Sequence, residues 1–173
     1  MSKVMVLKVF TPLLIIGGLC GVLLILTNQF TAADIQANRE ARTRALLEEM
    51  LGQPLPAQTN IEADVFGTCT TWLFTRAETA GYAGPIYLTA LWRVSQASAD
   101  TQGLSMRVIA HRETPGIGDF IDHTRSPWIT ELDNTSAQAY AQLDAVSGAT
   151  ITSNAIKRAA SEIFNRLEIY CGG

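Results

Sequence analysis

The stretch Asp144-Ala-Val-Ser147-Gly148-Ala149-Thr150-Ile-Thr152-Ser153 stands directly before a run with helical periodicity. Glycine at position 148 permits a sharp turn, because it adopts backbone angles that are closed to other residues. The residues after the stretch place apolar side chains at helical spacing: Ala155, Ile156, Ala159, Ala160, Ile163, Phe164 and Leu167. The pattern predicts a turn and then a helix, with Thr152, Ser153 and Asn154 as possible caps.

The hydroxyl of Thr150 is expected at, or just before, the start of this helix. A helix N-terminus offers unpaired N–H groups and the positive end of the helix dipole, so it favours a phosphate. Ala149 is small and leaves room for a bulky group beside the hydroxyl. The alternative is an ordinary glycine turn followed by a Ser/Thr cap, which is common in proteins.

Strand-like segments fill the middle of the chain. Residues 61–66 and 71–78 are expected to form a hairpin-like pair, and residues 86–95 are rich in strand-forming types. A polar connection over 99–103 leads to residues 104–110, which alternate as a half-buried strand does. With a helix at each end, the pattern indicates an α+β domain built on an antiparallel sheet flanked by helices.

The N-terminus carries an apolar segment with no charged residue between Lys8 and Asp34. A helix over residues 9–30 is long enough to cross a bilayer core of roughly 30 Å. Lys3 and Lys8 precede the segment, so the positive-inside rule places the N-terminus in the cytoplasm and the remainder outside. A cleaved signal peptide ending near Ala32-Ala33 is the alternative.

A helix that continues out of the membrane is expected over residues 34–51, with Asp34 as a possible cap and the stretch from Gly52 to Pro56 as its stop. The chain of 173 residues has a net charge of only −3, which gives no basic footprint for nucleic acid. Cys69 and Cys171 could pair in an oxidising compartment, but two separate thiols are the expectation, since sequence does not give their distance.

The cysteine and histidine patterns do not indicate a metal site. No Cys-x-x-Cys pattern occurs, so an iron–sulfur or zinc centre is not expected. His111 and His123 are interpreted as ordinary surface or loop histidines. Lys157 and Arg158 are interpreted as part of a solvated helix face, and an approach to a phosphate at the helix start is the alternative.

Two further glycine-containing segments are expected to be loops, Gly81-Tyr-Ala-Gly84-Pro-Ile and Glu113-Thr-Pro-Gly-Ile-Gly-Asp119. Aromatic residues in strand-like stretches are more often part of a core than of a cofactor site, whereas Tyr82 stands in the first of these two loops.

These segments, in this order after an N-terminal anchor, resemble the G subunit of Rnf electron-transport complexes and the C subunit of the Na⁺-translocating NADH:quinone oxidoreductase. In that family a D-x-x-[ST]-G-A-[TS] segment is recognised by a flavin transferase, and its last hydroxyl is esterified to the phosphate of FMN. The resemblance implies covalent FMN on Thr150, with Asp144, Ser147, Gly148 and Ala149 completing the motif.

The same resemblance implies that Thr114, Gly116, Gly118 and Tyr82 border the flavin. Relatives commonly have Lys after the Asp of the second loop, whereas this chain has Phe120, so no charge contact is expected from that position.

The implied function is that of an electron-transfer subunit in an Rnf-like membrane complex, which couples ferredoxin/NAD electron transfer to Na⁺ or H⁺ transport. The subunit would belong to a translocase without being catalytic alone, and its partners would be the other membrane subunits. Residues 1–33 would form the cytoplasmic N-terminus and single-pass anchor in the bacterial inner membrane, and residues 34–173 a periplasmic FMN-binding domain. The alternatives are an anchored FMN-binding sensory or scaffold module without translocation, and a plain anchor without cofactor.

Overall fold

The computed structural model describes residues 3–93 and 103–171. The chain divides into two compact units, Met1–Ala45 and Leu46–Gly173. The helix α1, Lys3–Leu51, extends through the first unit and ends in the second. Residues 94–102, which include most of the expected polar connection, lie outside the described residues.

Within the described residues, α1 is the one helix that is long and apolar enough to cross a membrane. Large apolar side chains are exposed along it from Phe10 to Ile35, as expected for a lipid-facing segment. The hydroxyls of Thr27 and Thr31 donate to the carbonyls four residues earlier, so they are satisfied inside the helix. The N-terminal apolar helix is therefore confirmed.

The helix continues through residues 34–51 as expected, but the expected cap at Asp34 is wrong, because Asp34 lies inside this continuous helix. Residues 22–51 contain neither glycine nor proline, so no residue interrupts the hydrogen-bond ladder there. The helix stops at Gly52, which has a φ of 75° and donates its N–H to the Glu48 carbonyl. Glycine accepts this left-handed conformation without strain, which makes it a common helix terminator.

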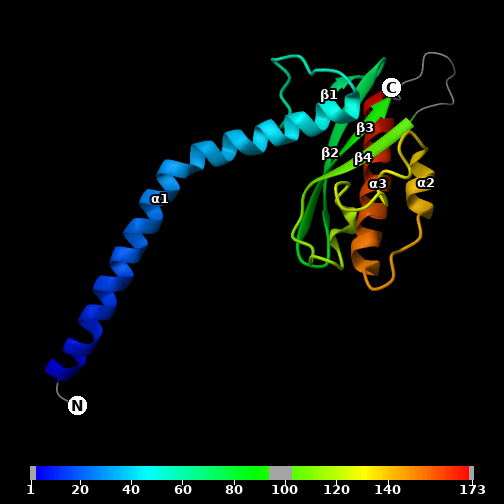
Figure 1. Cartoon of the computed structure of the whole chain (residues 1–173). Coiled ribbons are helices and arrows are strands. Elements are labelled where there is room, and N and C mark those ends of the chain that lie inside the picture. Colours follow the sequence, from blue (N-terminus) through cyan, green and yellow to red (C-terminus); the bar gives the residue numbers. More distant parts are fainter. Residues whose placement is uncertain (1–2, 94–102, 172–173) are drawn as a thin grey trace. The chain divides into compact units, whose positions relative to one another are not determined.

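Four antiparallel strands form one sheet in the order β1-β2-β3-β4 (Figure 1). Their bounds are Val65–Thr68, Trp72–Ala80, Pro85–Arg93 and Gly103–Ala110. The expected antiparallel sheet with helices is confirmed, but the first strand was predicted four residues too early. Residues 61–64 instead form turns, in which the Ala63 N–H donates to the Asn60 carbonyl.

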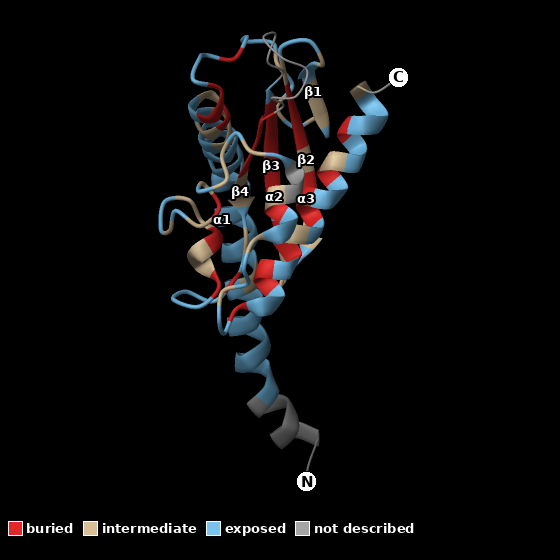
Figure 2. Ribbon diagram, turned by 90° about the vertical axis from the view of Figure 1, so that its right-hand side faces the viewer, coloured by how far each residue is buried: buried red, intermediate tan, exposed pale blue. Residues whose placement is uncertain are grey.

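The sheet is covered on both faces. One face packs against α3, Thr150–Cys171, through buried residues such as Leu73, Leu88 and Met106. On the other face Phe74 and Leu91 pack with the last turn of α1. The helical periodicity predicted the buried side of α3 correctly, and Figure 2 shows buried residues along one side of that helix.

Two short helical elements were not predicted, the 3₁₀ helix η1 (Asp119–Ile121) and α2 (Ala137–Gln142). Neither is long enough to show a helical period in sequence. In α2 the Ser136 side chain accepts a hydrogen bond from the Ala139 N–H and caps the helix.

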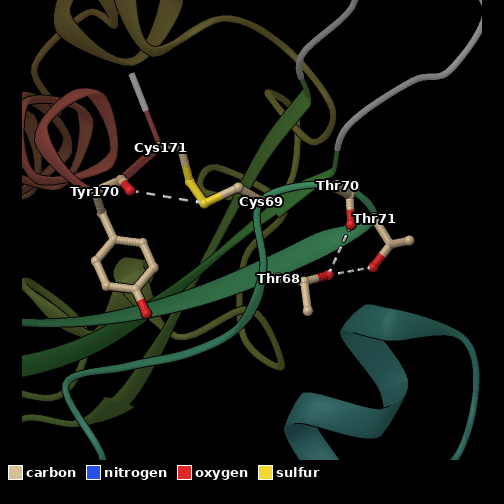
Figure 3. Close-up of a disulfide and its surroundings, with 6 residues drawn as sticks. All are labelled: Thr68, Cys69, Thr70, Thr71, Tyr170 and Cys171. Atoms are coloured by element: carbon tan, nitrogen blue, oxygen red, sulfur yellow. Dashed lines mark hydrogen bonds between the residues drawn. A yellow bond between two sulfur atoms is a disulfide. The ribbon is translucent and has the colours of Figure 1, made fainter. Parts of the chain in front are cut away.

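Cys69 and Cys171 form a disulfide, so the expectation of separate thiols is wrong. Cys69 lies in the turn between β1 and β2, and Cys171 ends α3 (Figure 3). Their Cα atoms are 5.6 Å apart although 102 positions separate them in sequence. The pairing depends on how α3 crosses the sheet, which local sequence patterns do not reveal. The bridge fixes the C-terminal end of α3 to the β1–β2 turn.

Candidate functional site

A tight turn precedes α3. The Ala149 N–H donates to the Val146 carbonyl at 3.0 Å, and Gly148 between them has a φ of 81°. A β-carbon on Gly148 would meet no atom within 4 Å, so the backbone conformation, not crowding, requires glycine here. The helix begins at Thr150, whose side chain is exposed, whereas Ala149 is buried. The turn thus presents the Thr150 hydroxyl at the helix start, as predicted.

Ser153 holds this turn against the helix. It is fully buried, its hydroxyl accepts from the Val146 N–H at 3.0 Å, and it donates to the Ala149 carbonyl at 3.0 Å. The expectation that Thr152, Ser153 and Asn154 cap the helix is wrong, because all three lie inside α3. The helix starts earlier than these three side chains suggest, since the turn at Gly148 leads directly into it.

The loop of residues 113–119 follows β4 and is organised around Thr114. Its carbonyl accepts from the N–H groups of Ile117, at 3.1 Å, and Gly118, at 2.9 Å. Gly116 has a φ of 77°, and its N–H donates to the Asp119 carboxylate at 2.9 Å. Proline followed by a glycine of positive φ is typical of a type II turn, which accounts for the predicted loop.

The acidic residues after this loop anchor its end. Asp119 pairs with Arg125 at 3.0 Å, and Asp122 accepts hydrogen bonds from the Thr124 N–H and hydroxyl at 2.9 and 2.8 Å. Burial alone would favour the neutral acid, but the two bonds from Thr124, together with nearby His123 and His111, lower the pKa of Asp122 below its ordinary value.

The loop of residues 81–84 joins β2 to β3 and contains Tyr82. The Gly81 N–H donates to the Gly84 carbonyl at 2.9 Å, which closes the loop. The Tyr82 side chain is 71% exposed. Other aromatic residues pack with each other instead: Trp72 with Phe74, Trp92 with Phe164, and Phe120 with Trp128.

Glu113 joins all three segments. Its buried carboxylate accepts from the Thr152 hydroxyl at 2.7 Å and from the Ala83 N–H at 3.2 Å. A β-carbon on Gly81 would lie 2.3 Å from one carboxylate oxygen, and one on Gly118 would lie 2.8 Å from the other. The Glu113 N–H donates to Nδ1 of His111 at 3.1 Å, a structural role that sequence did not show for this histidine.

The three segments line a half-open cavity of about 390 Å³. Of the site residues expected from sequence, six line it: Tyr82, Thr114, Gly118, Gly148, Ala149 and Thr150. Asp144, Ser147 and Gly116 do not belong to the lining. Four lining residues were not predicted: Glu113, Ile117, Ile151 and Thr152. The glycines that make room for Glu113 are the sequence signal that could have indicated its importance.

The cavity combines apolar and polar walls. Tyr82, Ile117 and Ile151 line it although each is more than half exposed, and exposed apolar groups around a cavity are typical of a ligand site. At the N-terminus of α3, the backbone hydrogen-bond ladder begins with the bond from the Ser153 N–H to the Ala149 carbonyl. The N–H groups of Ile151 and Thr152 therefore have no partner within the helix and favour an anion.

Lys157 and Arg158, the two cationic residues in the first half of α3, do not belong to the cavity lining. The guanidinium of Arg158 donates to the Ala80 carbonyl at 3.1 Å and so ties α3 to the end of β2. Arg158 is exposed, as expected, but it makes a specific contact.

Comparisons with known proteins identify the kind of site. Residues 81–165 match the FMN-binding domain family, and this range includes all three cavity segments. The chain thus carries an FMN-binding domain. It is 33% identical over 170 residues to the G subunit of the ion-translocating oxidoreductase complex of Pseudomonas aeruginosa, an alignment that covers 79% of this chain and 77% of the relative.

Two further relatives are G subunits of the same kind of complex. The chain is 33% identical over 172 residues to the protein of Stutzerimonas stutzeri, covering 82% of this chain and 72% of the relative. It is 28% identical over 169 residues to that of Shewanella loihica, covering 79% and 77%. The chain belongs to the family of G subunits of ion-translocating oxidoreductase complexes.

The residues present fit FMN. The start of α3 provides N–H groups for a phosphate, and the exposed Thr150 hydroxyl lies on the cavity lining beside them. Tyr82, Ile117 and Ile151 offer apolar surface for a planar ring.

Proposed function

We propose that this chain is an electron-transfer subunit that carries FMN esterified to Thr150 in a membrane ion-translocating oxidoreductase complex. The observation that carries the proposal is the exposed Thr150 hydroxyl, which lies at the first position of α3 in the lining of the cavity. When bound, FMN supplies the electron chemistry, and the protein supplies attachment, orientation and electrostatic tuning.

The positions of the motif residues support a division of roles. Asp144 and Ser147 are exposed and outside the cavity lining. In the proposal a flavin transferase recognises these two exposed side chains, while Gly148 and Ala149 form the turn that leads into α3. Ester formation joins the Thr150 oxygen to the phosphate with net loss of one water, and the phosphodiester keeps one negative charge. The N–H groups of Ile151 and Thr152 stabilise that charge.

The cavity walls hold the remainder of the flavin in this proposal. Tyr82 and Ile117 exclude water from its ring, and the Thr114 segment supplies backbone groups at the cavity edge. Gly116 acts indirectly, since its positive φ forms the turn that carries Ile117.

We place residues 34–173 outside the cytoplasm and residues 1–33 in the anchor and cytoplasmic N-terminus. Lys3 and Lys8 precede the span, but Arg39, Arg42 and Arg44 follow it, so charge alone gives a weak orientation signal. The Cys69–Cys171 disulfide supports the assignment more strongly, because disulfides persist in oxidising compartments. The expected location is the bacterial inner membrane.

Protease added to intact spheroplasts tests the orientation. The domain beyond Asp34 should be digested in intact spheroplasts. Complete protection there, together with digestion after permeabilisation, would contradict the assignment.

The complex as a whole is proposed to couple electron transfer between ferredoxin and NAD to movement of Na⁺ or H⁺. The names of the relatives support membership of an ion-translocating oxidoreductase. The apolar segment between Lys8 and Asp34 has no ionisable side chain except Cys20, so the ion path belongs to partner subunits. Copurification of multispanning subunits supports this role, whereas an isolated flavoprotein would favour the sensory or scaffold alternative.

The attachment is tested with Thr150→Val in a host that carries the transferase. Valine keeps the branched shape and removes the oxygen. No described residue hydrogen-bonds to the Thr150 hydroxyl, so stability should change by less than about 0.5 kcal/mol. The variant should lose the flavin fluorescence that survives denaturing electrophoresis, while Thr150→Ser should retain part of it. Persistent fluorescence in Thr150→Val would place the attachment elsewhere.

A further inference from the structure

The Glu113 carboxylate is the one acidic group in the lining of the cavity. It is 5% exposed, and its two oxygens each accept a hydrogen bond, one from the Thr152 hydroxyl and one from the Ala83 N–H. A carboxylate that only accepts has the hydrogen-bonding pattern of the ionised form. Both donors are neutral, so their dipoles screen its negative charge only in part and no opposite charge cancels it.

No cation among the described residues forms an ion pair with Glu113. Buried carboxylates are usually paired, because an uncompensated charge is costly away from water. The sequence also makes room for this group, since side chains on Gly81 and Gly118 would collide with it. Because Glu113 lines the cavity, its negative charge lies next to any ligand bound there.

We propose that Glu113 is a positioning and potential-setting residue of the FMN site. Its carboxylate joins the first turn of α3 to the Tyr82 loop and places a fixed negative charge at the cavity wall. Reduction adds electron density to the flavin, and a nearby negative charge opposes it. Glu113 thereby lowers the midpoint potential of the FMN. The proposal rests on the proposed function, because it requires FMN in this cavity.

Glu113→Gln is the direct test, since glutamine keeps the size and one acceptor oxygen and removes the charge. The full chain is produced with the transferase, and flavin on Thr150 is first verified by in-gel fluorescence and peptide mass. The midpoint potential is then measured by spectroelectrochemical titration. At a fixed potential the ratio of reduced to oxidised flavin should rise at least tenfold, which is about 30 mV for a two-electron couple.

Glu168→Gln is the matched control. It also removes one negative charge, but from an exposed position on α3. Glu168 is 18 residues after Thr150, a separation of about 27 Å along a helix. Its flavin should titrate as in the wild type. An unchanged potential in Glu113→Gln, with flavin verified on Thr150, would overturn the inference, and so would an equal shift in Glu168→Gln. Absence of flavin from wild-type Thr150 would instead overturn the proposed function.

Thr152→Val provides an independent test if Glu113→Gln does not fold. It removes one donor and leaves the carboxylate less compensated, so the potential should become more negative. A structural disturbance would shift both variants in the same direction, whereas the charge mechanism shifts them in opposite directions. An unchanged or more positive potential in Thr152→Val would refute the charge mechanism.

Discussion

Replacing Ser153 with alanine should destabilise the domain measurably. The Ser153 hydroxyl accepts from the Val146 N–H and donates to the Ala149 carbonyl, both at 3.0 Å, and its side chain is fully buried. Alanine provides no acceptor, and the side chains packed around position 153 limit the access of water. The Val146 N–H is partly buried and would lose its partner, and an N–H left unpaired away from water costs about 1–3 kcal/mol.

A small gain offsets part of this loss, because alanine has a helix propensity up to about 0.7 kcal/mol better than serine. The net loss in the free energy of unfolding should be about 1–2 kcal/mol. Ser161→Ala is the matched control, since Ser161 also donates to the carbonyl four residues earlier but is exposed. That variant should be neutral or slightly stabilised.

Denaturant titration of both variants in detergent, followed by tryptophan fluorescence, measures the difference. Because Ser153 holds the turn that presents Thr150, flavin incorporation should also be lower in Ser153→Ala than in Ser161→Ala. Equal free energies of unfolding, within about 0.5 kcal/mol, would refute the assignment of Ser153 as the residue that holds the turn.

Three further predictions concern the turn, the disulfide and the acidic loop. Gly148→Ala should cost about 1–2 kcal/mol, because its φ of 81° is left-handed; an unchanged thermal midpoint would exclude this conformation. Replacing Cys69 and Cys171 together with serine should lower the unfolding free energy by about 2–5 kcal/mol, and equal denaturant midpoints under non-reducing conditions would show that the bridge does not form. The lowered pKa of Asp122 stabilises the fold above the ordinary carboxyl value, near 4, and this contribution is lost as pH falls through the folded pKa. The stability difference between wild type and Asp122→Asn should therefore shrink in acid, and a difference independent of pH would contradict the Asp122 assignment.

Local sequence patterns were sufficient for several elements. The helical spacing from Ala155 to Leu167 predicted the buried side of α3, and strand alternation predicted β4. The glycines at 116 and 148 marked turns that need a positive φ. These features depend on neighbours a few residues apart, and such contacts leave a periodic or compositional signal.

Contacts between distant residues left no comparable signal. The Cys69–Cys171 bridge depends on the path of α3 across the sheet, and the Glu113–Thr152 bond joins two segments 39 positions apart. The caps were misplaced for a related reason. Ser153 resembles a cap in sequence, but its hydroxyl bonds backward to Val146 and Ala149 from inside the helix.

The central claim is that Thr150 carries FMN, and peptide mass spectrometry of the wild-type protein tests it most directly. The protein is purified from a host with the transferase, and the peptide from Asp144 to Lys157 is fragmented to locate any modification. The peptide should carry the mass of FMN less one water, on Thr150. Thr152 is buried and donates to Glu113, so it should be unmodified. An unmodified peptide, or flavin on Ser147 or Thr152, would contradict the claim.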